Sequence, residues 1–237
     1  MQEFRRLGEK TLLEQPKQLS SHPGANMRWK RIALFLARYP QLYHVSLCSD
    51  SETVLRLGLL SAASVLDSVG ASASLRKTLQ QSQRKSVIHV SHPVHGALFL
   101  NDQLPLPASA LVRCLIGITP AQWYEELNQR IFFWLSRSQA ERFAAVRKTL
   151  LPPKTLFVLN TEKLLRGQAE SFDLCAFNSG NAMRKPVPRS VASFQSLAVY
   201  PLAERARQRG WKRAAVELSI RRDHLTIRSA VEQIEAL

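Results

Sequence analysis

The stretch QLYHVSLCSDSETVLRLGLLSA, residues 41–62, decides the fold class of this chain. Its first part, QLYHVSL (41–47), is made of strand-forming residues and runs into a polar turn that offers helix N-caps. The apolar segment 52–57 then predicts a short helix that ends at Gly58. This arrangement puts His44 near the end of a strand, where it is either packed in the core or directed at a ligand.

The same succession of strand and helix patterns continues along the chain. We expect further strands at 86–90, 130–136, 155–161 and 214–220, and a strand followed by a turn over 96–107. Helices are expected before Pro40 and at 62–69, 73–85, 109–117, 119–130, 137–151 and 162–167. Residues 168–200 are rich in Pro, Ser and Asn, which predicts mostly loop. The chain carries neither the glycine-rich fingerprint of Rossmann folds nor a P-loop. The prediction is an α+β fold with a small sheet flanked by helices.

The length and polarity of the chain bound its organisation. With 237 residues it can bury a sizeable core. We predict a poorly ordered extension over residues 1–26, where prolines and a glycine stand in a polar background, and a single α+β domain over 27–237. No apolar run approaches the roughly 20 residues that cross a bilayer, and the N-terminus lacks the apolar centre of a signal peptide. We therefore expect a cytoplasmic protein.

The charge balance indicates an anionic partner. Lys and Arg number 33 against 18 Asp and Glu, a formal net charge of +15. Such a chain attracts polyanions, and nucleic acid is the leading class because each phosphate contact releases counterions. Anionic small molecules such as a dinucleotide, or no specific partner, are the alternatives. The basic side chains that we expect to contact DNA or RNA are Arg76, Lys77, Arg84, Lys85, Arg184, Lys185, Arg209 and Lys212.

Cysteine and histidine patterns do not predict a metal site. The cysteines Cys48, Cys114 and Cys175 are widely spaced and form no CxxC pair, so we expect buried free thiols. The densest histidine group, HVSHPVH (89–95), is interrupted by a proline and alternates across a strand, which favours loop packing over convergent ligands.

Two further segments hold candidate functional residues. The turn NSGNAMRK (178–185) offers backbone N–H groups beside two cations, a combination that can hold a phosphate or form an ordinary surface turn. Glu217 stands between apolar residues in AAVELSI (214–220). A carboxylate inside an apolar strand is costly unless it is paired, lies in a site or points to solvent on the polar face of the strand.

Five segments, LYHVS, VLRLGLLSA, ITPAQWYEELNQRIFFWLS, FNSG and VELSI, resemble in this order a bacterial family catalogued only as a domain of unknown function. The family label carries no activity. The same layout is similar, more distantly, to ADP-ribosyltransferase folds, above all those of toxins that modify DNA bases and of RNA 2′-phosphotransferases. That resemblance implies an ADP-ribosyltransferase-like fold with a split β-sheet.

The resemblance also implies roles for particular residues. In those groups a histidine at a strand end bonds the NAD ribose, an aromatic ring from a second strand stacks on the nicotinamide, and a glutamate on a late strand steadies the transition state. The matching positions here are Tyr43, His44 and Ser46, then Phe132, Phe133 and Trp134, and finally Glu217. Glu217 and His44 are thus the expected catalytic pair. Donors for the NAD pyrophosphate would come from Arg130 or from Asn178 and Ser179.

The function expected from this reasoning is an NAD-dependent ADP-ribosyltransferase-like enzyme that acts on a nucleic acid. A carboxylate at Glu217 would stabilise positive charge on the ribose and could act as a base toward the acceptor. The alternatives are an RNA 2′-phosphotransferase-like enzyme and a non-catalytic nucleic-acid-binding module on the same scaffold.

Overall fold

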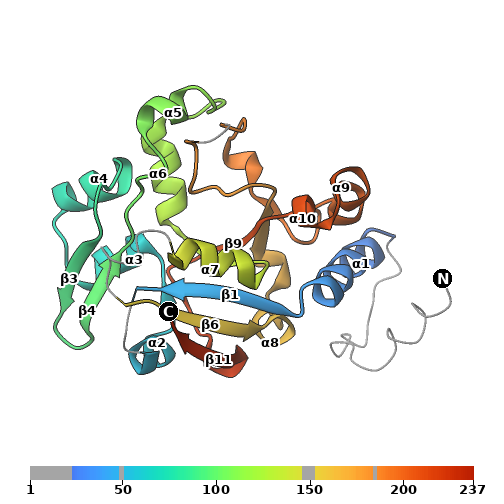
Figure 1. Ribbon diagram of the computed structural model, residues 1–237, viewed down its shortest axis with the longest axis horizontal. Helices are drawn as coiled ribbons and strands as arrows, with labels where there is room; N and C mark the ends of the chain where they lie inside the picture. The colour runs from blue at the N-terminus through green and yellow to red at the C-terminus, as the bar shows by residue number, and fades with distance from the viewer. Residues whose placement is uncertain (1–22, 48–50, 146–152, 184–185) are drawn as a thin grey trace.

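A computed structural model describes residues 23–47, 51–145, 153–183 and 186–237 (Figure 1). Its centre is a seven-stranded antiparallel sheet in the order β11-β6-β1-β5-β9-β7-β8. From one edge to the other, the strands are β11 (Val231–Ala236), β6 (Thr155–Asn160), β1 (Gln41–Ser46), β5 (Arg130–Trp134), β9 (Glu217–Arg221), β7 (Phe172–Cys175) and β8 (Gln195–Ser196). The predicted α+β class is confirmed.

Helices and two small sheets surround this sheet. The α-helices are α1 (Pro23–Arg38), α2 (Ser51–Leu57), α3 (Ala62–Ser68), α4 (Ala73–Gln81), α5 (Ala108–Val112), α6 (Pro120–Asn128), α7 (Arg137–Ala145), α8 (Thr161–Leu165), α9 (Leu202–Arg209) and α10 (Trp211–Ala214). Short 3-10 helices are η3 (Ala169–Ser171), η4 (Val191–Ser193) and η5 (Arg228–Ala230). The small sheets pair β2 (Leu59–Leu60) with β10 (His224–Leu225), and β3 (Ile88–His92) with β4 (Gly96–Leu100). None of the described helices has the length and apolar character that crossing a membrane requires.

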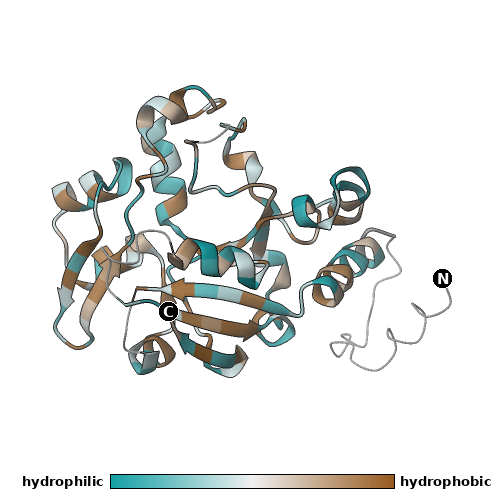
Figure 2. Ribbon diagram, in the orientation of Figure 1, coloured by the Kyte–Doolittle hydropathy of each residue, from teal (hydrophilic) through white to brown (hydrophobic). Residues whose placement is uncertain are grey.

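Each face of the large sheet buries its own hydrophobic cluster, as side-chain alternation along the strands requires. On one face, Leu42, Phe133 and Leu218 pack with Phe35 of α1 in the largest cluster. On the other face, Val45 packs against α7, while α6 covers the β7 end with residues that include Trp123. The inner strands are correspondingly apolar in Figure 2, most clearly β6.

β1 and β5 share fewer paired positions than any other neighbouring strands of the large sheet. β1 pairs with β6 along its whole length, at six positions from Gln41 to Ser46. With β5 it forms a single bridge, Tyr43 to Trp134. Beyond that bridge no further backbone pairing joins the two strands, and the His44 side chain bonds across to the carbonyl oxygen of Phe132.

Most predicted elements are present, with shifted ends. Thr119 caps α6 through its side chain and forms a capping box with Gln122, as the sequence predicted for Thr119. Gly58 ends α2 at a φ of 77°, where a Cβ would lie 2.5 Å from the carbonyl oxygen of Leu225.

Three expectations need correction. Residues 168–200 are mostly loop, as predicted, but the prediction missed β7, which lies inside the large sheet. The basic helix at 73–85 ends at Gln81, and the chain then turns inward at Arg84. Residues 23–26 belong to α1 instead of a poorly ordered extension; the rest of that predicted extension, 1–22, lies outside the described residues.

Candidate functional site

The three strands that carry the sequence motifs are neighbours at the centre of the large sheet. Tyr43 of β1 lies opposite Trp134 of β5, and Trp134 lies opposite Glu217 of β9. Residues that are opposed in an antiparallel ladder point to the same face, so these three side chains form one row. The row continues to Cys175 of β7. The fold thus brings together one residue from each motif, although the motifs are far apart in the chain.

Glu217 is buried, with 4% of its surface exposed. Its Oε2 accepts hydrogen bonds from the backbone N–H of Ser179 at 3.1 Å and from the Ser179 hydroxyl at 2.7 Å. Burial raises the pKa of Glu217 from 4.5 to about 7, against the opposing effects of the two Ser179 bonds and of the Arg189 charge. The predicted site residues Ser179 and Glu217 are therefore in direct contact, and the carboxyl group titrates near neutral pH.

Arg189 holds the loop that carries Ser179, and the sequence reasoning missed it. The guanidinium donates to the carbonyl oxygens of Ser179 at 3.2 Å, Asn181 at 3.1 Å and Val187 at 3.2 Å. It also lies 4.9 Å from the ring of Phe177, and only 2% of Arg189 is exposed. A single arginine among the prolines of this loop gives no sequence pattern by which it could have been found. Asn178 is half-buried at the start of the same turn.

The side chain of His44 links β1 to β5. Its Nδ1 lies 2.9 Å from the backbone carbonyl oxygen of Phe132, which can only accept, so Nδ1 carries the proton. Burial lowers the pKa of His44, and the bond to Phe132 offsets only part of that effect. The ring is accordingly neutral near pH 7, and its Nε2 is a hydrogen-bond acceptor.

His44 and Glu217 leave their strands on opposite faces of the sheet. His44 follows Tyr43 in β1 and so points to the other side, where its ring lies 5.8 Å from that of Phe133. Ser46, two residues further along β1, shares the face of His44, as predicted. The expected catalytic pair is thus separated by β5 and lies on opposite faces of the sheet.

The aromatic candidates differ in their accessibility. Phe133 is 1% exposed within the main core, so its ring has no open face for a ligand. Trp134 is half-buried and lies 5.6 Å from the ring of Phe143 on α7. Tyr43 is also half-buried, and its hydroxyl donates to Gln41. Phe132 is half-buried as well and packs against the cluster under α6. Trp134, Tyr43 and Phe132 are therefore the rings of the motifs that keep some exposure on the face of Glu217.

Arg130 is already engaged by the protein itself. It is 7% exposed and forms ion pairs with Glu126 at 2.8 Å and Asp173 at 2.7 Å. It also donates to the Ser219 hydroxyl and lies 4.0 Å from the ring of Phe194. These contacts occupy the donors that the sequence reasoning assigned to a pyrophosphate.

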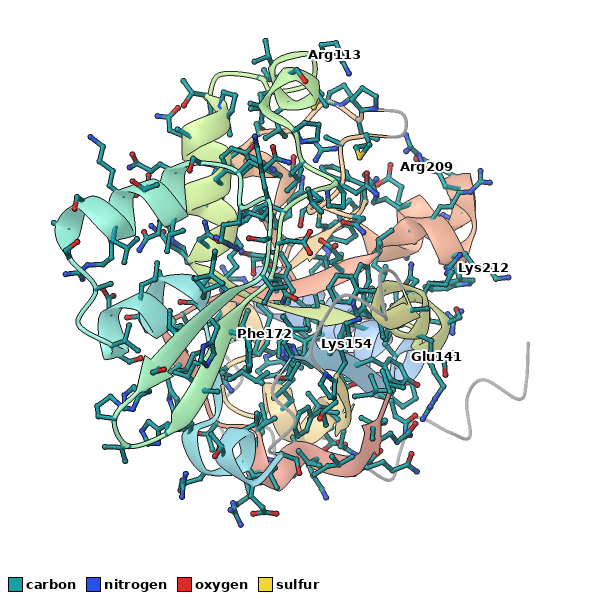
Figure 3. All side chains as sticks on the ribbon, turned by 60° about the vertical axis from the view of Figure 1, so that its left-hand side comes forward. Arg113, Glu141, Lys154, Phe172, Arg209 and Lys212 are labelled. Atoms are coloured by element: carbon teal, nitrogen blue, oxygen red, sulfur yellow. The ribbon has the colours of Figure 1, made fainter. Side chains whose placement is uncertain are left out.

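The basic residues expected to contact nucleic acid fall into separate groups. Arg76 and Lys77 are on α4, and Lys85 is exposed nearby, whereas Arg84 is buried and donates to Asn101, Leu79 and Asn128. Arg209 and Lys212 lie close together at the edge of the molecule, on α9 and α10, while the exposed Arg113 stands apart from them (Figure 3). Arg184 and Lys185 lie outside the described residues.

An open, polar hollow of about 630 Å³ lies at the end of β9 that is remote from Glu217. Its lining includes Arg76 and Gln80 of α4 together with Gln129, Arg221 and Asp223. Arg76 is paired with Asp67, and Arg221 with Glu126, so this hollow is nearly balanced in charge.

The fold and the site define an α+β protein with a buried glutamate, whose pKa is about 7, on a central strand of an antiparallel sheet. Residues 40–231 match the model of a family described as "Family of unknown function (DUF7002)", and the chain belongs to that family. No curated protein and no solved structure matches the chain.

Proposed function

We propose that this protein is an NAD-dependent ADP-ribosyltransferase-like enzyme that acts on a nucleic acid. The observation that carries the proposal is the row of Tyr43, Trp134 and Glu217 on three adjacent strands. Each comes from a different motif of the resemblance to ADP-ribosyltransferases. A row of this kind supplies a carboxylate and flat aromatic walls on one face, which are the groups that transfer from NAD needs.

Glu217 is suited to the chemical step. Both bonds from Ser179 go to Oε2, and within the described residues no hydrogen bond to Oε1 is recorded. Oε1 is the atom that would meet a ribose hydroxyl. In the transfer, the bond between ribose C1′ and the nicotinamide nitrogen breaks and nicotinamide leaves. The acceptor oxygen or nitrogen then bonds to C1′, and its proton goes to the Glu217 carboxylate.

His44 would act from the face of the sheet opposite to Glu217. Its neutral Nε2 can accept a hydrogen bond from a ribose hydroxyl, because Nδ1 already donates to Phe132. A ligand that meets both His44 and Glu217 would need β1 and β5 to separate where the ladder is unpaired, because the two side chains lie on opposite faces. With Arg130 engaged and both donors of Ser179 bonded to Glu217, the donor for a pyrophosphate would come from Asn178 in the same turn.

The test is the release of nicotinamide from NAD by the full chain, with single-stranded DNA, duplex DNA or RNA as acceptor. We expect Glu217→Gln to lower the rate roughly a hundred-fold or more, because the amide cannot stabilise positive charge on the ribose. Glu162→Gln on α8 is the matched control and keeps full activity. A Glu217→Gln variant that is folded and as fast as the parent would refute the proposal.

A second candidate is a non-catalytic nucleic-acid-binding module, and one observation favours it. His44 and Glu217 lie on opposite faces, and each forms a hydrogen bond within the protein, to Phe132 and to Ser179 respectively. Both side chains could then be purely structural. This candidate predicts salt-sensitive binding of DNA or RNA without any turnover of NAD.

The RNA 2′-phosphotransferase alternative has no comparable support. That chemistry needs arginines at a phosphate, whereas Arg130 is bound to Glu126 and Asp173. Arg113 is exposed and distant in the view of Figure 3 from the strands that carry the motifs.

A further inference from the structure

We infer that α1, α9 and α10 form a binding surface for single-stranded nucleic acid. The three helices lie together at one end of the molecule, remote from α4 and the β3–β4 hairpin (Figure 1). We call this region the basic–tryptophan surface. It consists of Arg28, Trp29, Lys30, Arg31, Arg38, Arg205, Arg207, Arg209, Trp211, Lys212 and Arg213.

Tertiary contacts join the two parts of the surface, which come from opposite ends of the sequence. Arg31 of α1 donates to the carbonyl oxygen of Ala198 at 3.2 Å, just before α9. At the other end of α1, the guanidinium of Arg38 lies 5.4 Å from the ring of Trp211 in α10. The basic segments 28–31 and 205–213 therefore form one surface.

The surface carries a large excess of positive charge. Of its nine cations, Arg28 pairs with Glu170, and Glu204 is the acidic residue on α9 itself. Lys30, Arg207, Arg209, Lys212 and Arg213 form no ion pair with any carboxylate in the described part of the chain. All five are exposed. Unpaired cations on adjacent helices are complementary to a phosphate backbone.

Two exposed tryptophans distinguish this surface from a merely basic one. Trp29 is 38% exposed and Trp211 is 37% exposed, although a tryptophan ring is usually covered. Proteins that bind single strands combine exposed aromatic rings, which stack on the faces of unpaired bases, with cations, which attract the phosphate backbone. In a duplex those base faces are covered by their neighbours. The partner that fits is thus a single strand.

The inference goes beyond the transferase proposal and does not rest on it. Glu217 and Trp134 lie in the large sheet, whereas these side chains project from helices that flank it. The surface can hold a strand whether or not NAD is consumed.

The experiment measures fluorescence anisotropy of a labelled single-stranded oligonucleotide and of the duplex of the same sequence, between about 50 mM and about 200 mM salt. Trp29→Ala with Trp211→Ala removes the rings and leaves every charge. We expect this pair to weaken single-strand binding by roughly ten-fold or more and duplex binding little. Arg209→Glu with Lys212→Glu reverses two charges, and we expect it to weaken binding and to reduce the salt slope by about two.

The matched control is Lys163→Glu with Arg166→Glu, two exposed cations in α8 and at its C-terminal end. We expect the control to bind nearly as the parent protein does. The inference is overturned if the control loses as much affinity as the Arg209 and Lys212 variant, or if the tryptophan variant binds unchanged. It is also overturned if only anionic phospholipid vesicles, and no oligonucleotide, are bound. Release of nicotinamide by the same variants tests the transferase proposal separately.

Discussion

Ser179 donates two hydrogen bonds to one carboxylate oxygen of Glu217, from its backbone at 3.1 Å and from its hydroxyl at 2.7 Å. This contact joins the loop after β7 to the first residue of β9. The same carboxyl group has a pKa raised to about 7 by burial. Loop anchoring and the proposed chemistry therefore depend on one ionisable group, and the two roles can be separated by mutation and by pH.

The first prediction concerns the pH dependence of stability. Because the pKa of Glu217 rises from 4.5 in the unfolded chain to about 7 in the fold, the folded protein holds this proton more tightly. The contribution favours folding below about pH 4.5 and is lost as the pH rises through about 7, up to about 3 kcal/mol in all. Glu217→Gln should remove this slope. Urea unfolding at several pH values compares the two proteins, and identical slopes would show that Glu217 is not the group responsible.

The second prediction concerns Ser179. Ser179→Ala deletes the hydroxyl that lowers the pKa of Glu217 while the backbone donor remains. The pKa of Glu217 should then rise further, and the pH at which nicotinamide release reaches half its maximum should rise with it. Stability near neutral pH should fall by about 1 to 3 kcal/mol. Ser82→Ala, at the exposed end of α4, is the control and should change neither quantity. An unchanged pH profile in Ser179→Ala would contradict the coupling.

The third prediction separates the two roles of His44. In His44→Asn the side-chain amide can replace Nδ1 as the donor to Phe132, but its oxygen does not reach the position of Nε2. His44→Ala lacks both groups. We expect the Asn variant to be more stable than the Ala variant by about 1 kcal/mol, with NAD turnover lost in both. Thermal unfolding and nicotinamide release measure the two effects. Full turnover in His44→Asn would make the histidine a purely structural residue.

The fourth prediction concerns Arg189. Arg189→Met removes the donor to three backbone carbonyls and leaves the buried carboxylate without its nearby positive charge. We expect a loss of about 3 kcal/mol in the free energy of unfolding and faster amide exchange around Ser179. Arg166→Met, exposed at the end of α8, should stay within about 0.5 kcal/mol of the parent. Equal losses in the two variants would show that Arg189 does not hold the loop.

Local sequence patterns predicted the helices and strands around the site. They could not predict features that depend on contacts between residues far apart in the chain. The cap at Thr119 and the strand at 41–47 follow from short-range rules, and both were correct. The membership of β7 in the sheet was missed, because its four residues lie in a polar segment and pair only with distant strands. The sequence pattern placed Arg84 in a basic helix. Instead, the chain turns inward after α4 ends, and the Arg84 side chain donates a hydrogen bond to Asn128.

In the candidate site, too, local patterns predicted some features, and contacts between distant residues decided the others. Period-two alternation correctly put His44 and Ser46 on one face of β1. It could not give the register between strands, and the register sets Tyr43, Trp134 and Glu217 in one row with His44 facing away. Nor could the sequence show that Arg130 is neutralised by Glu126 and Asp173, which come from two other elements.

The most direct test of the central claim is nicotinamide release from NAD by the parent protein and by Glu217→Gln, measured with a single-stranded DNA acceptor between about pH 5 and about pH 8. The ionised carboxylate is the active form, so the parent rate should rise through about pH 7, where the pKa of Glu217 lies. Glu217→Gln should stay folded and show no rise. A parent protein that releases no nicotinamide with any acceptor, or a variant that follows the parent at every pH, would contradict the account.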